Sequence, residues 1–187
     1  FSKRVATAIE GAFERNLINS TSHYEVELRL LQHREGGFVP LLKLYTLPDH
    51  RFDYRRYYVA ASMKPMMAAG LMALAKPYLK EYAQILDPFC GVGTLLMERR
   101  FAVPARNAYG IDTFGEAIEK ARVNSKIAGM QTNYINRDYF DFVHDYKFDE
   151  IVTDLPAGNL SKPELDDLYR RFFEKSDEVL AEDGRMI

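Results

Sequence analysis

The stretch ILDPFCGVGT, at residues 85–94, constrains the fold of this chain more than any other. Apolar residues lead into Asp87, and two glycines, Gly91 and Gly93, follow one residue apart. This order predicts a buried strand that ends in a carboxylate, a tight turn over the glycines and a helix that begins near Thr94. Glycine is needed where φ is positive or a ligand approaches closely, and the first helical turn offers unpaired N–H groups. The stretch therefore predicts a small-molecule site, against the alternative of an ordinary strand-to-helix turn.

The same residues indicate which ligand the turn would bind. Leu96 stands where a dinucleotide fingerprint requires a third glycine, and Asp87 would set a carboxylate beside a pyrophosphate. Both features disfavour NAD and FAD. A carboxylate at the strand end suits a ligand with a cationic amine, such as S-adenosylmethionine, whose amino-acid portion would lie over Gly91 and Gly93.

Composition excludes several classes of protein. The 187 residues, 47% hydrophobic and 28% charged, are typical of a globular protein of one domain and a part. No apolar run is long enough to span a membrane, and we see no signal peptide. One cysteine, Cys90, and four histidines without ligand spacing predict a reduced, metal-free protein of the cytoplasm. Phe1 is not an initiator Met, so we expect an upstream segment.

Residues 1–50 form an accessory piece in our interpretation. Apolar residues at helical spacing predict an amphipathic helix over 2–17, and alternation predicts a strand over 24–30 with one wet face. A turn at 34–37 leads to a return strand over 38–47. A helix followed by a hairpin does not belong to a doubly wound sheet.

Residues 51–83 are predicted to be a linker with a leading helix. Arginines and tyrosines are interleaved in RFDYRRYY, as they would be in an RNA surface of guanidinium forks and stacking rings formed by Arg55, Arg56 and Tyr57. The alternative is a solvated linker whose tyrosines cover the edge of the core. Because the net charge is −2, any RNA-binding surface must be a local patch or lie outside this chain. Ser62 is the predicted cap of a helix that Pro77 kinks or ends.

Residues 84–187 alternate strand and helix, which predicts an α/β fold with a parallel sheet covered on both faces. Asp112 follows the second strand, where a carboxylate can accept both hydroxyls of a ribose. Asp138, after the third strand, can accept a hydrogen bond from an adenine amino group, with Tyr139 or Phe140 against the ring. A fourth strand runs into TDLPAG. We expect the last helix to start at Pro163 and end at Gly184. The predicted segments are strands at 85–87, 107–111, 132–136, 148–154 and 185–187, and helices from 94 and over 115–128.

With ILDPFCGVGTLLME, YGID, NRDYF and TDLPAG in this order, the chain resembles the S-adenosylmethionine-dependent methyltransferases. It is most similar to the THUMP-associated RNA methylases, which include guanine-N2 methyltransferases of rRNA and tRNA. The resemblance, from Tyr24 to the end, implies a Rossmann-like class I methyltransferase sheet, truncated after its fourth or fifth strand. Residues 1–50 would then be the tail of a THUMP-like RNA-binding region. The cofactor residues we expect are Asp87, Phe89, Cys90, Gly91, Gly93, Thr94, Asp112, Asp138 and Tyr139.

By resemblance, Asp154 and the Leu155 carbonyl accept hydrogen bonds from an exocyclic nucleobase amine, and Pro156 shapes their loop. This localises the nitrogen lone pair for attack on the sulfonium methyl without a strong general base. Val92 replaces a usual Ser or Thr, a mild change. Ala157 stands where the family has an aromatic residue that stacks on the base, so another ring, from the set Tyr54, Tyr57 and Tyr169, would have to replace it or activity would be weak or lost.

The leading hypothesis is an RNA methyltransferase that acts on a base amine, with guanine N2 of rRNA or tRNA as the expected target. The alternatives are a catalytically impaired RNA-binding module and a DNA amino methyltransferase. The target RNA and the oligomeric state are not indicated by the sequence.

Overall fold

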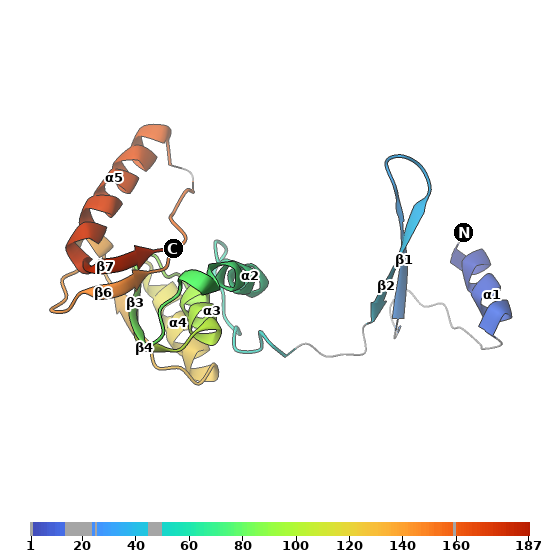
Figure 1. Cartoon of the computed structure of the whole chain (residues 1–187), viewed down its shortest axis with the longest axis horizontal. Coiled ribbons are helices and arrows are strands. Elements are labelled where there is room, and N and C mark those ends of the chain that lie inside the picture. The colour runs from blue at the N-terminus through green and yellow to red at the C-terminus, as the bar shows by residue number, and fades with distance from the viewer. Residues whose placement is uncertain (1, 14–23, 25, 45–49, 159) are drawn as a thin grey trace. The chain divides into compact units, whose positions relative to one another are not determined.

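The computed structural model describes residues 2–13, 24, 26–44, 50–158 and 160–187. The chain divides into two compact units, Phe1–His50 and Arg51–Ile187 (Figure 1). The stretch 51–83 packs as part of the second unit, because Tyr54 is 5% exposed and Met72 is 3% exposed.

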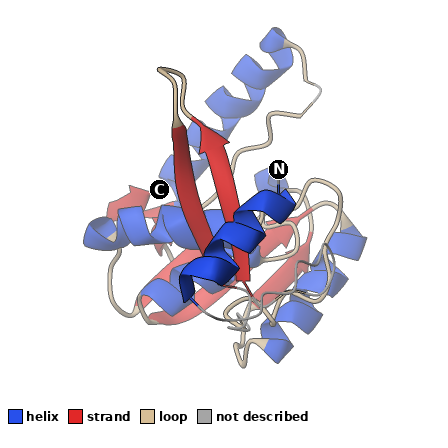
Figure 2. Ribbon diagram, turned by 90° about the vertical axis from the view of Figure 1, so that its right-hand side faces the viewer, coloured by secondary structure: helices blue, strands red, loops and turns tan. Residues whose placement is uncertain are grey.

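The first unit contains one helix and one hairpin. Helix α1 (Ser2–Phe13) precedes strands β1 (Val26–Gln32) and β2 (Phe38–Leu44), which pair antiparallel and are seen in Figure 2 as two red strands joined by a tan turn. The predicted ends of the helix at residue 17 and of the strand at residue 47 lie outside the described residues. In the described part of the hairpin, both faces carry exposed apolar side chains, so the expected covered face is not formed there.

The second unit is built on a five-stranded sheet in the order β5-β4-β3-β6-β7, with every neighbouring pair parallel. This confirms the predicted α/β class. The strands are β3 (Ala83–Asp87), β4 (Ala105–Asp112), β5 (Asn133–Asn136), β6 (Phe148–Ile151) and β7 (Leu180–Met186).

Helices cover both faces of this sheet. Ile85 packs with Leu96 and Ile118 in one apolar cluster, whereas its neighbour Leu86 packs with Phe172 in another. Successive strand residues point to opposite faces, so the clusters lie on opposite sides of the sheet, with α5 on one side and α3 and α4 on the other (Figure 1). The helices are α2 (Pro65–Ala75), η1 (Lys76–Tyr78), α3 (Thr94–Ala102), α4 (Gly115–Ile127), η2 (Tyr139–Asp141) and α5 (Lys162–Val179). Within the described residues, none of these helices has the length and apolarity to cross a membrane.

Two predicted helix boundaries are wrong. Lys64, not Ser62, occupies the N-cap of α2, and the Ser62 hydroxyl oxygen instead accepts a hydrogen bond from the Val59 N–H at 2.9 Å. Helix α5 ends at Val179 and continues directly into β7. Gly184 therefore lies inside a bulged strand, where a Cβ would come within 2.8 Å of the Ala181 carbonyl oxygen.

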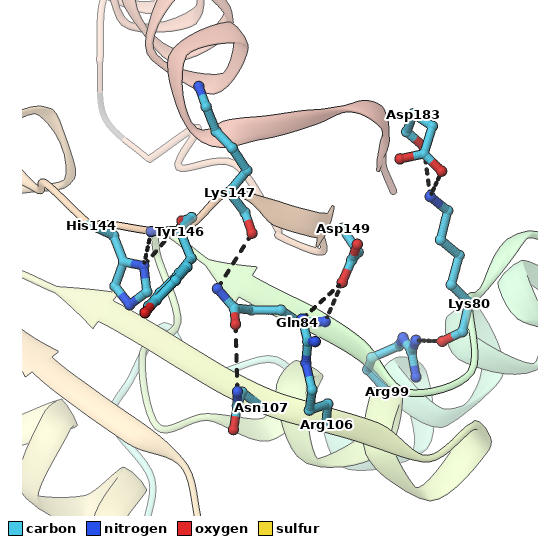
Figure 3. Close-up of polar contacts among 10 residues, drawn as sticks. All are labelled: Lys80, Gln84, Arg99, Arg106, Asn107, His144, Tyr146, Lys147, Asp149 and Asp183. Atoms are coloured by element: carbon cyan, nitrogen blue, oxygen red, sulfur yellow. Dashed lines mark hydrogen bonds and ion pairs between the residues drawn. The ribbon is translucent and has the colours of Figure 1, made fainter.

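A buried ion pair holds the amino edge of the sheet. Arg99 of α3 and Glu150 of β6 are both 0% exposed, and Nε donates to Oε2 at 2.7 Å. The other guanidinium nitrogens donate to the carbonyls of Val103 at 2.6 Å and Lys80 at 2.7 Å, and Glu150 also accepts from the Lys80 N–H. The group thus connects a helix, a strand and the segment before β3, part of which appears in Figure 3.

We predict that Arg99→Ala lowers the free energy of unfolding by about 3–5 kcal/mol, because it leaves the Glu150 carboxylate buried without its cation. Urea denaturation measures this loss. The matched control is Arg170→Ala on α5, whose guanidinium pairs with exposed carboxylates and whose loss should change stability little. Equal effects of the two substitutions would contradict the assignment.

Candidate functional site

Four aspartates gather at the carboxyl edge of the sheet. Asp87 ends β3, Asp112 ends β4, Asp138 follows β5 and Asp154 follows β6. Carboxyl ends of parallel strands meet at one edge, and all four side chains line a single cavity of about 690 Å³. Most of the predicted site residues line this cavity as well: Phe89, Cys90, Gly91, Thr94, Tyr139, Leu155 and Pro156.

The glycine loop, residues 88–93 between β3 and α3, is shaped by its neighbours. Gly91 has φ of 51° and Gly93 has φ of 78°, in the left-handed region that favours glycine. A Cβ on Gly93 would lie 2.2 Å from the Tyr134 hydroxyl oxygen. Gly93 does not belong to the cavity lining, unlike Gly91. Its glycine is therefore explained by packing against β5 and by its place at the N-cap of α3.

Asp87 is a buried carboxylate that forms no ion pair within the described residues. It is 2% exposed, and its Oδ1 accepts from the Thr153 hydroxyl at 2.8 Å and the Phe89 N–H at 3.1 Å. Burial raises its pKa to about 7, and the nearby carboxylates of Asp112 and Asp154 add to this shift, while the two hydrogen bonds oppose it. Both hydrogen-bond partners are neutral, so a cationic ligand group in the cavity would favour the ionised form.

Asp112 links the glycine loop to α4. Its Oδ2 accepts from the Gly91 N–H and its Oδ1 from the Phe114 N–H, each at 2.8 Å. A carboxylate oxygen has two lone pairs, so each oxygen retains a site for a ligand hydroxyl. The N–H groups hold the carboxylate in one orientation toward the cavity.

The segment after β5 differs in part from our expectation. Asp138 is exposed and its Oδ1 accepts from the Phe140 N–H at 2.9 Å, so it caps η2 as well as lining the cavity. Tyr139 is 1% exposed, and its hydroxyl lies 3.2 Å from the Ser176 hydroxyl in the core. Burial raises the Tyr139 pKa to about 12. Phe140 is less buried and lies under the Arg171 guanidinium, 3.9 Å from the ring centroid, so the geometry favours Phe140 over Tyr139 as the ring that contacts a ligand.

The loop after β6 carries the predicted catalytic group. Asp154 is exposed, while Leu155 and Pro156 are half-buried, and these residues and the exposed Ala157 line the cavity. The aromatic residues of the lining come from other segments: Phe89, Phe114, Tyr139 and Phe140. None of the three tyrosines suggested as a replacement for the missing ring at position 157 lines the cavity.

Of these three tyrosines, Tyr54 is the one most clearly excluded as the replacement ring. It is 5% exposed, and its hydroxyl is hydrogen-bonded to the Glu98 carboxylate. Burial is the largest cause of the raised pKa of both groups. Tyr54 therefore anchors the basic-aromatic segment against α3 and cannot stack on a substrate base.

The predicted RNA residues lie beside the cavity. Arg55 Nε donates to the Thr94 hydroxyl oxygen at 3.2 Å, and its guanidinium lies 5.5 Å from the Tyr58 ring centroid. Arg56 and Tyr57 are exposed. None of these residues lines the cavity, but the chain reaches it a few residues later, at 59 and 61–63.

Asn124 is a site residue that sequence reasoning missed. It is 0% exposed; its Oδ1 accepts from the Tyr57 N–H at 3.0 Å, and its Nδ2 donates to the Tyr57 carbonyl at 2.8 Å. Nδ2 also lies 3.5 Å from the Val92 carbonyl of the glycine loop. One buried amide thus connects the basic-aromatic segment with the glycine loop. The available signal was a polar residue on the apolar stripe of α4, in register with Ile118 and Ala121.

We predict that Asp87→Asn stabilises the ligand-free protein at pH 8 more than at pH 5. The pKa of Asp87 is about 7 in the folded state against an ordinary value of 3.8. The folded state therefore binds this proton more tightly, and the stability that results is lost as pH rises toward 7 and above. Thermal denaturation at both pH values measures the difference, with the exposed Asp141→Asn as control. An equal gain at both pH values would contradict the raised pKa.

Comparisons with known proteins agree with this geometry. A family model described as RMKL-like, methyltransferase domain, matches residues 53–187. The chain is 32% identical over 156 residues to the tRNA (guanine(10)-N2)-dimethyltransferase of Methanothermobacter thermautotrophicus, across 79% of this chain and 45% of that protein. It therefore spans about half the length of this curated relative.

Solved structures show the same fold. The crystal structure of TrmN from Thermus thermophilus matches with a TM-score of 0.71 and 24% identity, over 98% of this chain and 54% of that one. An S-adenosylmethionine-dependent methyltransferase from Clostridium acetobutylicum matches with a TM-score of 0.54 and 20% identity, over 67% of this chain and 50% of that one. These likenesses confirm the predicted Rossmann-like methyltransferase fold.

Proposed function

Because this chain belongs to the RMKL-like methyltransferase domain family, we propose that it is an S-adenosylmethionine-dependent RNA methyltransferase. The proposed reaction is methylation of an exocyclic base amine, with guanine N2 in tRNA or rRNA as the target. The proposal rests above all on one arrangement: the Asp154 loop and the glycine loop line the same cavity. The relative from Methanothermobacter, named a tRNA guanine-N2 dimethyltransferase, supports the choice of base and of RNA.

The donor set fits S-adenosylmethionine. The desolvated Asp87 carboxylate, with only neutral hydrogen-bond partners, suits the ammonium group of its amino-acid portion. Asp112 has lone pairs free for the ribose hydroxyls, and Asp138 is placed for an adenine amino group with Phe140 beside it. When bound, this cofactor supplies an electrophilic methyl group on a sulfonium.

The protein's part in the reaction is to position and polarise the amine. The Asp154 carboxylate and the Leu155 carbonyl accept hydrogen bonds from the amine N–H groups, and this turns the nitrogen lone pair toward the methyl donor. Pro156 restricts the loop that carries both acceptors. Fixed acceptors placed in advance lower the barrier through orientation and electrostatics.

RNA would approach along the exposed residues Arg56 and Tyr57, and the Tyr57 backbone is held by Asn124. Ala157 gives no stacking surface, so the target base would rest on the apolar residues of the lining, with Phe89 as the nearest ring in sequence to the glycine loop.

We predict that Asp112→Ala weakens S-adenosylmethionine binding at least tenfold, because the variant loses the acceptors for the ribose and the anchor of the Gly91 N–H. Isothermal titration calorimetry measures the affinity. Asp141→Ala, an exposed carboxylate of η2, is the matched control and should bind normally. Unchanged affinity in Asp112→Ala would refute the ribose role.

We predict that Asp154→Ala lowers methyl transfer by about 100-fold or more, the usual loss when one preorganised charge-stabilising group is removed. Cofactor affinity should change little, because Asp87 and Asp112 are unaltered. Tritium transfer from labelled cofactor to tRNA and rRNA from cells that lack the gene measures the rate. Transfer by the wild type to DNA alone would favour a DNA amino methyltransferase. No transfer to any RNA would contradict the proposed function.

A further inference from the structure

A second cavity, which the proposed reaction does not use, lies at the amino edge of the sheet. Its volume is about 480 Å³, and its lining comes from the C-terminal parts of α3 and α4 and the beginnings of β4 and β5. Four cationic residues line it: Arg100, Arg106, Arg122 and Lys126. The described lining contains no carboxylate and includes the neutral polar residues Asn107, Gln131, Thr132 and Asn133.

The cations of this cleft are only partly neutralised. Arg100 donates to the Gln131 carbonyl at 2.6 Å and to the Thr132 hydroxyl oxygen at 3.2 Å, which are both neutral acceptors. Burial lowers the pKa of Arg100. Lys126 forms no ion pair within the described part of the chain. Arg122 is paired with Glu119 on the exposed surface of α4, and its Nη2 donates to the Tyr134 carbonyl at 2.9 Å.

Arg106 is the cation whose donors are most open. Its Nη2 lies 3.8 Å from Asp149 Oδ2, beyond hydrogen-bond distance, and that oxygen already accepts from the Gln84 N–H at 2.7 Å. Figure 3 shows Arg106 beside the Gln84 and Asp149 contacts, with Asn107 held by the Gln84 side chain at 3.4 Å. The side chain of Arg106 is 62% exposed. Its guanidinium can therefore turn its donors to a ligand.

Helix dipoles account for the positions of only two of the four cationic residues. Cations are favoured near helix C-termini, and Arg100 and Lys126 occupy the last turns of α3 and α4. Arg106 lies on a strand, and Arg122 lies in the middle of α4, so neither is placed by a helix end. A concave set of guanidinium forks with hydroxyl and amide donors between them has the chemistry of a phosphate site.

We propose that this cleft binds a backbone phosphate of the RNA substrate, at a point remote from the methyl-transfer cavity. This inference rests on the proposed function. Helix α4 carries both Asn124, which holds Tyr57, and the cleft residues Arg122 and Lys126. An RNA strand that passes Arg56 and Tyr57 can therefore continue along α4. On strand β4 the second cavity is lined by residues 106–108 and the first by Asp112. Four to six strand residues, about 13–20 Å, therefore separate the two linings along β4.

The test is the salt dependence of RNA binding by the intact protein. The double variant Arg106→Gln/Lys126→Gln removes the cations that are not bonded to backbone carbonyls. Loss of this phosphate contact should reduce the slope of log affinity against log salt by about 0.7–0.9 for a tRNA probe. The matched control, Arg170→Gln/Lys175→Gln on α5, removes the same charge and should leave the slope unchanged. A guanosine-containing dinucleotide, too short to span both cavities, should bind both doubles like the wild type.

Three results would overturn the inference. Equal slopes for the two doubles would show that the cleft makes no phosphate contact. If the wild type still methylated tRNA, the proposed function would stand without this inference. Weaker dinucleotide binding by the cleft double would mean that the substitutions act through the methyl-transfer cavity. Loss of inorganic phosphate binding without a change in the tRNA slope would make the cleft a site for small anions only.

A wild type that binds no RNA at any salt concentration would refute the proposed function itself, and this result is distinct from equal slopes. Because Lys126 is exposed, Lys126→Ala alone provides a second variant if the double is unstable, with an expected reduction in the same direction of at most about 0.7–0.9.

Discussion

The buried ion pair between Arg99 and Glu150 is the contact on which the arrangement of the second unit depends. Every guanidinium nitrogen has an acceptor, and both carboxylate oxygens are occupied. Two charges in a dry interior are tolerated only when they are so completely paired. The pair ties α3 to β6 and to the Lys80 backbone. It thereby fixes the helix that follows the glycine loop against the strand that precedes the Asp154 loop.

The positions of the site carboxylates could be predicted because they depend on strand ends alone. A parallel strand that carries an Asp at its carboxyl end delivers it to a common edge, whatever the side-chain packing. Asp87, Asp112 and Asp154 follow this rule. Contacts with distant segments could not be foreseen. Tyr139 lines the cavity, but the contact of its hydroxyl with Ser176, a residue far along the chain, has no signal in the sequence. The end of α5 was predicted wrongly because a glycine after an apolar stripe is typical of a helix end, whereas Gly184 lies in a bulged strand.

Asn124 shows how the basic-aromatic segment and the glycine loop are joined. A buried amide must have its hydrogen bonds satisfied, and here its partners are the Tyr57 backbone and the Val92 carbonyl. Displacement of either segment would leave that amide unpaired at a cost of about 1–3 kcal/mol. The two segments are therefore held in one register. A strand of RNA on Tyr57 and a ligand on the glycine loop would meet a surface that is already organised for both.

The distribution of charge over the second unit fits the proposed action of a chain of net charge −2 on a polyanion. Carboxylates line the methyl-transfer cavity, so it repels phosphate but accepts hydrogen bonds from a base amine and attracts an ammonium group. Cations line the cleft at the other edge of the sheet. Arg55 contacts Thr94 of the cavity lining, and the neighbouring Tyr57 backbone is bonded to Asn124 of α4. The backbone of a nucleic acid would be held away from the acidic cavity, and only an extruded base would enter it. This separation of charge favours a base amine over the phosphate backbone as the group that reaches Asp154.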